Sequence, residues 1–267
     1  MRQLFLALSL ILALSAFSFA QEPLQVGWAV ITPVSTTTSG LVVFETFGFS
    51  RSATDTLQAA IIPAGLTTNA LIFVNTSTRL TRNVGVAVVN PQSTSVSVTL
   101  TLRRDDGTPF ATSITLTVPA MSQVSKFVTE LFTGLPADFI GTLTLTSPSP
   151  VGVVGLRFRG TNFSTIPITN VSPGGAVPSI ATGVGGAGAV LLPQFAVGGT
   201  PAWASEIVLT NTTATTMTVR LDLYKPDGTP LIANLNSKTS SSFANLTISA
   251  GGVLTIAPRN AQGDSVF

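Results

Sequence analysis

Residues 95–110, which read SVSVTLTLRRDDGTPF, decide the fold class of this chain. They begin by alternating Ser or Thr with Val or Leu, the period of a strand with one buried and one solvated face. The Asp106-Gly107 pair then predicts a turn, because Asp accepts hydrogen bonds from nearby backbone amides and Gly readily adopts a positive φ. The same alternation recurs in residues 142–146 and 217–223, so the sequence predicts an all-β protein of antiparallel strands.

The turn sequence returns near the end of the chain as PDGTPL, residues 226–231. Gly107 follows Asn90 by 17 residues, and Gly228 follows Asn211 by the same 17 residues. The strand alternation between these points has the same phase in both stretches, which two unrelated turns would not share. The two stretches are therefore predicted to be copies of one unit, with corresponding residues 121 positions apart.

A second element is also repeated, and it carries no DGTP turn. Residues 26–32 and 39–44 resemble residues 140–146 and 152–158, in that order. We call this element the back half of the unit, and the element with the DGTP turn the front half. The predicted organisation is a signal peptide (1–20), an N-terminal back half (21–66), one complete unit (67–172), a Gly/Pro/Ala-rich linker (173–187) and a C-terminal front half (188–267).

This order leaves a back half at one end of the chain and a front half at the other. A front half alone would expose an apolar sheet face and an unpaired strand edge, and both promote association. Three arrangements are open: residues 21–66 close onto 188–267 in one molecule, they donate strands to a neighbour, or the reading frame is truncated at Phe267. Strand donation repeated head to tail would build a filament.

The N-terminus predicts export. Arg2 is followed by an apolar run over residues 4–17 and by Ser18-Phe19-Ala20, the pattern of a signal peptide cleaved after Ala20. The alternative is an uncleaved anchor helix, for which the apolar run is short. No later stretch is apolar enough for a helix to span a membrane, so the mature protein is predicted to be secreted or displayed on the cell surface.

The composition excludes several kinds of chemistry. The chain has no Cys and no His, which excludes zinc sites of the common His/Cys kind and catalysis by a Ser-His or Cys-His pair. Charged residues make up only 9% of the chain and the formal net charge is +2, too little for a field that attracts nucleic acid. We therefore predict no enzymatic activity, no catalytic residues, no metal and no cofactor.

The acidic pair Asp105-Asp106 is the strongest candidate for a cation site. Calcium usually takes six or more oxygen ligands from several residues, and this turn supplies few of them. We therefore predict that the turn residues are structural and set strand register: Asp106, Gly107, Asp227 and Gly228. The predicted core residues include Trp28, Phe44, Val98, Leu100, Leu102, Leu143, Phe158, Leu209, Leu221 and Leu223.

One longer pattern carries a family likeness. Residues 191–199 (LLPQFAVGG), Trp203, residues 206–211 and the PDGTPL turn together resemble the repeated immunoglobulin-like modules of secreted bacterial surface and adhesive proteins. The resemblance implies β-sandwich modules in adhesive, stalk-like or matrix proteins, without catalysis. For this chain it implies two immunoglobulin-like antiparallel β-sandwich units, built from the repeated half-units.

Together these features predict an exported, non-enzymatic extracellular structural or adhesive protein, for which head-to-tail self-assembly by strand donation is one of the three open arrangements. Its predicted partners are other copies of itself or extracellular polymers, with no nucleic acid and no membrane span. The alternative function is a carbohydrate-binding module, which requires exposed aromatic side chains aligned on one face. Trp203 and Tyr224 are the candidate ligand-contacting residues for that alternative.

Overall fold

The computed structural model describes residues 27–32, 42–50, 56–61, 65–171, 181–199 and 203–265 of the 267-residue chain. The predicted signal peptide and the C-terminal Phe267 lie outside these residues, as does the first part of the predicted linker. The chain divides into two compact units, Met1–Thr36 and Thr37–Phe267, and residues 27–32 of the first unit form no regular secondary structure. No helix in the described ranges is long and apolar enough to cross a membrane.

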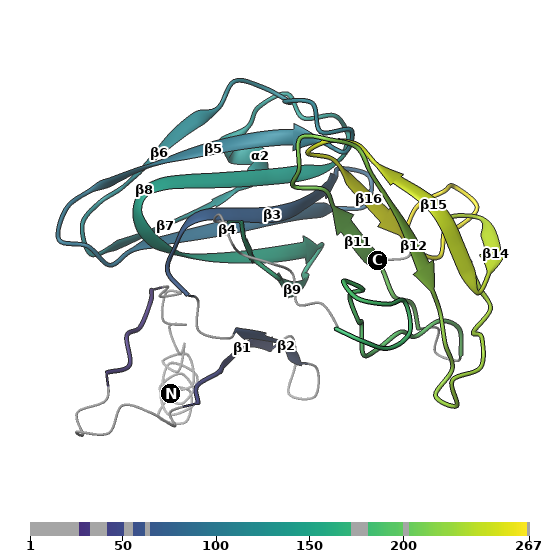
Figure 1. The fold of residues 1–267 in the computed structure, drawn as a ribbon. Helices are drawn as coiled ribbons and strands as arrows, with labels where there is room; N and C mark the ends of the chain where they lie inside the picture. Colours follow the sequence, from purple (N-terminus) through teal and green to yellow (C-terminus); the bar gives the residue numbers. More distant parts are fainter. Residues whose placement is uncertain are drawn as a thin grey trace, which may run out of the picture. The chain divides into compact units, whose positions relative to one another are not determined.

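Antiparallel strands make up nearly all of the regular structure in the described residues, where the single helix is α2 (Val128–Leu131). The prediction of an all-β chain with antiparallel sheets is confirmed (Figure 1). The strands are β1 (Glu45–Ser50), β2 (Thr56–Ile61), β3 (Thr67–Ser77), β4 (Arg82–Asn90), β5 (Val96–Arg104), β6 (Ile114–Val118), β7 (Ser122–Phe127), β8 (Asp138–Arg159), β9 (Asn162–Ile166), β10 (Thr169–Asn170), β11 (Ile207–Thr210), β12 (Met217–Asp222), β13 (Ala233–Leu235), β14 (Lys238–Ser240), β15 (Ser242–Ile248) and β16 (Val253–Ile256).

We call residues 67–170 the middle module. Its strands form an eight-stranded sheet in the order β10-β3-β4-β8-β5-β6, with β7 paired to β4 and β9 paired to β8. The strand β8 is 22 residues long and bends as it runs through the module (Figure 1). Its first part pairs with β3 and β5, and its second part pairs with β4 and β9. β8 is therefore the strand that links the ladders of this module.

The core of the middle module follows from the two-residue period of its strands. Val98, Leu100 and Leu102 of β5 are fully buried, whereas the threonines between them are exposed or half-buried. Leu143 and Leu145 of β8 belong to the same buried cluster. Burying one aliphatic side chain of this size stabilises a fold by about 1.5 to 3 kcal/mol, so this alternation supplies the main driving force for the module.

We call residues 188–265 the C-terminal module. Its strands form three separate two-stranded sheets, β11–β16, β12–β15 and β13–β14. A second buried cluster contains Ile207, Leu223, Leu235, Phe243 and Ile256. The β13–β14 hairpin lengthens this module. A residue before the hairpin lies 121 positions after its counterpart in the middle module, and a residue after the hairpin lies 130 positions after its counterpart.

Within the predicted N-terminal back half, β1 and β2 form a hairpin, and among the described residues β1 pairs with no other strand. Phe47 of β1 stacks on Phe163 of β9, with ring centroids 5.1 Å apart. In the described residues no strand of the C-terminal module pairs with this hairpin, so closure of 21–66 onto 188–267 by strand pairing is not observed there. The predicted core residue Phe44 is 71% exposed, and this prediction was wrong, because the two-stranded sheet beside it provides no second layer to cover it.

Candidate functional site

A buried asparagine organises the front half of the middle module. Asn90 is fully buried at the end of β4. Its side-chain nitrogen donates hydrogen bonds to the carbonyl oxygens of Thr94, Val118 and Pro119, at 2.8 to 3.1 Å. Its side-chain oxygen accepts a hydrogen bond from the backbone N–H of Gln92 at 3.0 Å. The asparagine therefore fastens the loop after β4 to the end of β6.

The C-terminal module has the same arrangement around Asn211, which is also fully buried. Its side-chain nitrogen donates to the carbonyl oxygens of Thr215, Ile248 and Ser249, at 2.7 to 3.1 Å. Its side-chain oxygen accepts from the backbone N–H of Thr213. Each of these partners corresponds to a partner of the first asparagine, so the two modules can be compared residue by residue.

The predicted turn residues lie at two turns of the same geometry. Asp106 accepts hydrogen bonds from the backbone N–H and the hydroxyl of Thr108, and Asp227 accepts the same pair from Thr229, at 2.6 to 2.9 Å. The threonine hydroxyl, followed by the backbone amide, holds the pKa of each carboxyl below its ordinary value. Both carboxylates therefore have hydrogen-bond partners within their own turns.

The first of these turns also contacts the C-terminal module. Gly107 has a φ of +86°, and a β-carbon built on it would overlap the carbonyl group of Ala250. Beside it, the backbone N–H of Val253 donates to the carbonyl oxygen of Asp105 at 2.8 Å. Gly228 has a similar φ of +82° but has open space around it. The glycine of the first turn is therefore required both for its φ and for this close approach.

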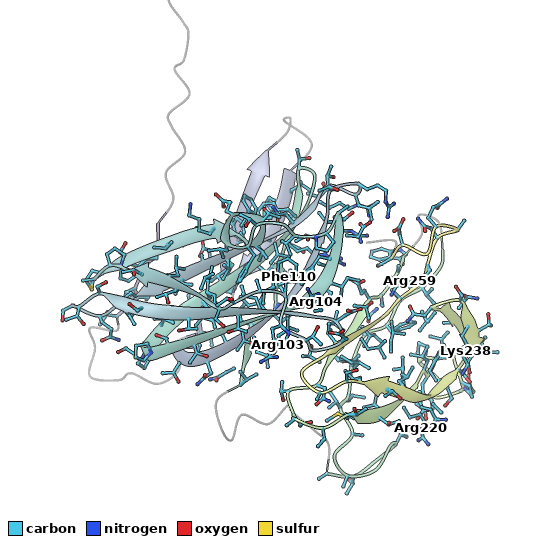
Figure 2. All side chains as sticks on the ribbon, turned by 90° about the horizontal axis from the view of Figure 1, so that it is seen from above. Arg103, Arg104, Phe110, Arg220, Lys238 and Arg259 are labelled. Carbon is cyan, nitrogen blue, oxygen red and sulfur yellow. The ribbon has the colours of Figure 1, made fainter. Side chains whose placement is uncertain are left out.

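Two arginines hold the first turn at the end of β5 (Figure 2). The guanidinium of Arg103 donates to the carbonyl oxygen of Gly107 at 3.0 Å. The guanidinium of Arg104 lies 5.3 Å from the centroid of the Phe110 ring and donates to the carbonyl oxygen of Pro109. Both arginines therefore direct their guanidinium groups to the turn itself.

A third turn of this kind, which the sequence reasoning missed, lies at the end of the described chain. Gly263 has a φ of +80°, and Arg259 forms an isolated bridge to Ser265, like the bridges that close the two DGTP turns. The side chain of Asn260 accepts backbone hydrogen bonds within the turn, in place of an Asp. The available signal was a Gly four residues after an Arg, as in the first turn, although the DGTP letters are absent.

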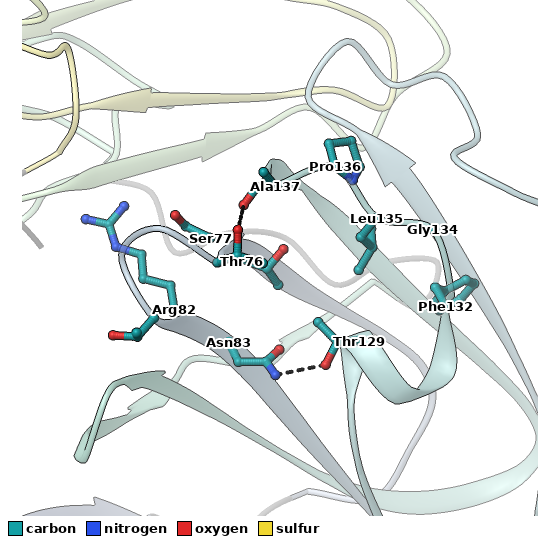
Figure 3. A pocket seen from close by; sticks show the side chains of 12 residues that line it. Thr76, Ser77, Arg82, Asn83, Thr129, Phe132, Gly134, Leu135, Pro136 and Ala137 are labelled. Atoms are coloured by element: carbon teal, nitrogen blue, oxygen red, sulfur yellow. Dashed lines mark hydrogen bonds between the residues drawn. The ribbon is translucent and has the colours of Figure 1, made fainter.

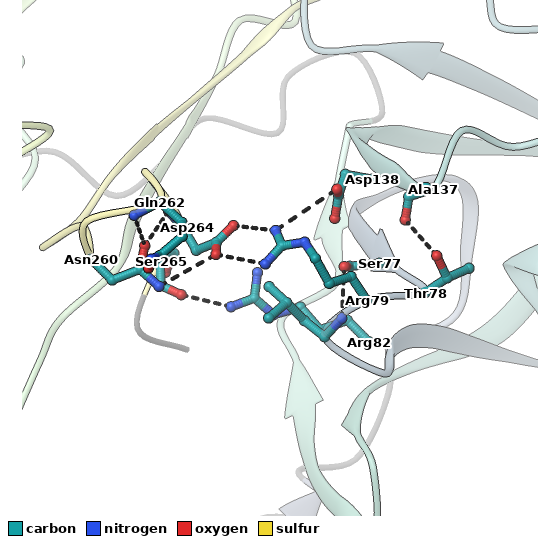
Figure 4. A network of polar contacts seen from close by, with 11 residues as sticks. Ser77, Thr78, Arg79, Arg82, Ala137, Asp138, Asn260, Gln262, Asp264 and Ser265 are labelled. Atoms are coloured by element: carbon teal, nitrogen blue, oxygen red, sulfur yellow. Dashed lines mark hydrogen bonds and ion pairs between the residues drawn. The ribbon is translucent and has the colours of Figure 1, made fainter.

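This third turn binds two arginines of the β3–β4 turn (Figure 4). The guanidinium of Arg79 donates to both carboxylate oxygens of Asp264, at 2.5 and 2.8 Å. The guanidinium of Arg82 donates to the carbonyl oxygen of Ser265 at 2.7 Å. The hydrogen bond from Arg79 lowers the pKa of Asp264 to about 2, and burial lowers the pKa of Arg82. Bidentate pairs of this kind fix orientation, so the contact ties the C-terminal turn to the middle module.

We expect the carboxyl group of Asp264 to titrate at about pH 2 in the folded protein. Because its pKa is lowered from 3.8, the contact with Arg79 stabilises the fold fully above about pH 4 and is lost as the pH falls through about 2. Replacing Arg79 with Ala should return the pKa of Asp264 toward its ordinary value. NMR titration of the carboxyl carbon measures both values, and an Asp264 pKa near 3.8 in the unchanged protein would contradict the contact.

The two modules differ in the strand that joins their ladders. By the 121-residue correspondence, β11 and β12 take the places of β4 and β5, and their partners β16 and β15 take the places of β7 and β6. In the middle module, β8 pairs with both β4 and β5. Among the described residues of the C-terminal module, no strand pairs with the corresponding edges of β11 and β12. We call these two edges the open edges.

Side-chain exposure also differs between the two modules. Val96 of β5 is 4% exposed, whereas the corresponding Met217 of β12 is 38% exposed. Ala70 of β3 pairs with β8 and is fully buried, whereas the corresponding Leu191 lies outside any strand and is 69% exposed. The C-terminal module therefore combines unpaired strand edges with exposed apolar side chains, and this combination favours association.

Both candidate aromatic residues lie at the open edges. Trp203 precedes β11 and is 68% exposed, and Tyr224 follows β12 and is 46% exposed. They correspond to Arg82 and Arg103, which are paired with residues of β8 in the middle module. The two aromatic side chains thus belong to different ladders, and both occupy positions that a strand covers in the middle module.

A pocket of about 530 Å³ lies at one end of the middle module (Figure 3). Arg82 is the charged residue in its lining, and the side-chain amide of Asn83 donates to the hydroxyl of Thr129 at 2.9 Å across it. No carboxylate lines this pocket to act as a general base. In the described ranges, no group of three or more acidic side chains is placed to hold a metal ion. The pocket offers the hydrogen-bonding groups of threonine, serine and asparagine side chains beside the guanidinium of Arg82.

The described residues form an all-β protein of antiparallel strands, in which β11, β12, β15 and β16 match β4, β5, β6 and β7 in their pairing, and no described strand takes the place of β3 or β8 in the C-terminal module. Comparisons with protein-family models, with curated proteins and with solved structures found no match. The middle module is therefore the best template for the C-terminal module, because it contains the strand that the described part of the C-terminal module lacks.

Proposed function

We propose that the protein is an exported, non-enzymatic structural or adhesive component, built of immunoglobulin-like β-sandwich modules, and that its C-terminal module binds a β-strand from a partner. The observation that carries this proposal is the pair of open edges. The middle module has β8 against β4 and β5, and the described C-terminal module leaves the corresponding edges of β11 and β12 unpaired.

Strand binding at an open edge is a physically sufficient mode of attachment. The incoming strand satisfies backbone N–H and C=O groups along the edge, and its alternate side chains enter the apolar layer. In this module the apolar layer is already partly assembled, since Leu223 and Ile207 are buried while Met217 remains exposed. A bound strand would complete a core of the kind seen in the middle module, so attachment and stabilisation would occur together.

The acceptor is tested with a synthetic peptide of residues 139–147 (FIGTLTLTS), the part of β8 that pairs with β5. We expect labelled peptide to bind the dilute full chain with a Kd of about 10 µM or tighter, measured by fluorescence anisotropy. The control peptide carries Val in place of Gly141, because a β-carbon there would overlap the carbonyl oxygen of Arg103 in the middle module. Equal binding of the two peptides, or no binding of either, would contradict strand acceptance.

A second candidate function is carbohydrate binding, favoured by the exposure of Trp203 and Tyr224. Aromatic faces of this kind stack on sugar rings, and the neutral Ser/Thr-rich chain would not repel a neutral polysaccharide. Retention on insoluble polysaccharides that is lost on changing both residues to Ala, together with no binding of the β8 peptide, would support this candidate over strand acceptance.

A further inference from the structure

We infer that the strand bound at the open edge of β12 is residues 26–32 of a second copy of this chain. The inference rests on the proposed strand-accepting function and names its partner. Its basis is the internal template, in which residues 140–146 of β8 cover β5, together with the sequence match between those residues and 26–32. Residues 26–32 thus have the composition of a strand of this module.

A glycine in the donor segment is the most specific part of the match. Gly141 of β8 lies opposite Arg104, and a β-carbon on it would overlap the backbone carbonyl of Arg103. Only glycine therefore allows β8 to approach β5 at that point. Gly27 occupies the same place in the donor segment, one residue after its first apolar residue. The donor thus carries the small residue that the template strand requires.

The template also fixes the register. Leu145 of β8 lies opposite Leu100 and is fully buried, and its neighbour Thr144 is half-buried. Transferred to the C-terminal module, Ile31 of the donor lies opposite Leu221 and enters the core. Val30 takes the place of the threonine and points to the other face, because successive side chains of a strand alternate.

The donor segment is available to a second copy. Residues 27–32 are in no strand, and Val30 and Ile31 are 69% and 61% exposed. The hairpin that follows is held on the middle module by the stacking of Phe47 on Phe163. Each copy therefore offers a donor before its middle module and an acceptor after it, and such a head-to-tail contact need not close into a ring.

The register is tested by two matched substitutions of neighbouring exposed residues, Ile31→Asp and Val30→Asp. Sedimentation velocity of the purified full chain over a range of concentrations measures assembly. We expect Ile31→Asp to raise the concentration for half-assembly by at least about tenfold, because it buries a charge, and Val30→Asp to change it by less than about threefold. Equal effects of the two changes, or none, would overturn the inference.

The source of the strand is tested by cross-linking, since the chain has no native Cys. By the template, Trp28 lies opposite Tyr224, as Thr142 lies opposite Arg103. Differently tagged chains carrying Trp28→Cys and Tyr224→Cys are mixed under mild oxidation, with Trp28→Cys plus Arg220→Cys as the out-of-register control. We expect a mixed disulfide dimer only in the first mixture.

The results of these experiments test the strand donor and the strand acceptor independently. A double variant with Cys at both positions that links only within single chains would show that the donor acts in its own molecule, and would overturn the inference. If the β8 peptide binds but Ile31→Asp does not change the concentration for half-assembly, the C-terminal module accepts a strand and residues 26–32 are not that strand. Failure of the peptide itself would reject the proposed function.

Discussion

Replacing Leu100 with Ala is expected to lower the free energy of unfolding of the middle module by about 3 kcal/mol, whereas Leu221→Ala in dilute protein should cost about 1 kcal/mol. The two leucines are corresponding residues of β5 and β12. Leu100 is fully buried and lies opposite Leu145 of β8, and Leu221 is half-buried beside an open edge. The same truncation therefore removes far more contact in one module than in the other.

Urea titration followed by the NMR signals of each module measures the two costs separately. At a protein concentration where chains associate, the cost of Leu221→Ala should rise toward that of Leu100→Ala, because the bound strand then covers the residue. If both leucines were covered in the same way, their costs would be equal at every concentration, and that result would contradict the open edge of β12.

Removing either buried asparagine should be as damaging as removing a large core side chain. Asn90→Ala leaves three carbonyl oxygens and one backbone N–H without their partner in a buried place, and each such loss costs about 1 to 3 kcal/mol. We expect a total of about 3 to 5 kcal/mol, because the loop relaxes and water replaces part of the lost bonding. Asn211→Ala should cost a similar amount, since its hydrogen bonds are equivalent.

The control for the asparagines is Asn90→Asp, which keeps the size and the accepting oxygen but loses the donating nitrogen. It should destabilise the middle module nearly as much as Ala at neutral pH, measured by the midpoint of thermal unfolding. A change of less than about 1 kcal/mol for both variants would show that the asparagine does not fasten the loop.

The sequence was sufficient to predict the strands and the two DGTP turns, because both depend on local chemistry. Alternation of Val and Leu with Ser and Thr in 95–102 became a strand with a buried and an exposed face. The 17-residue spacing from Asn to Gly proved useful because it starts at a residue with a full set of buried hydrogen bonds. Local patterns of this kind favour the same strand or turn whatever the rest of the chain does.

Long-range contacts could not be predicted in the same way. The sequence marks Gly107 as a turn residue, but its close approach to Ala250 depends on a part of the chain far away. The turn at Gly263 was missed because Gln262 stands at the position of the Asp and the accepting side chain is that of Asn260, two residues earlier, although the backbone geometry is the same. The pair of Arg79 with Asp264 joins residues 185 positions apart and has no local signature.

The open edges were anticipated only in outline. The order of the half-units predicts that a front half stands alone at the C-terminal end, but periodicity does not reveal which edges are left unpaired. The pairing of β8 with β4 and β5 supplies that information, because it identifies the neighbours that β11 and β12 lack. Phe44 was wrongly expected in a core for the related reason that burial depends on which layer covers a strand.

The most direct test of strand acceptance is amide hydrogen exchange of β12, measured residue by residue at low and at high protein concentration. Exchange reports whether a backbone N–H is hydrogen-bonded, and β5 of the middle module serves as the internal reference with partners on both edges. We predict that the outward-facing amides of β12 exchange quickly in dilute protein and become protected as the concentration rises, while β5 stays protected throughout. Protection of β12 that is the same at every concentration would contradict the account.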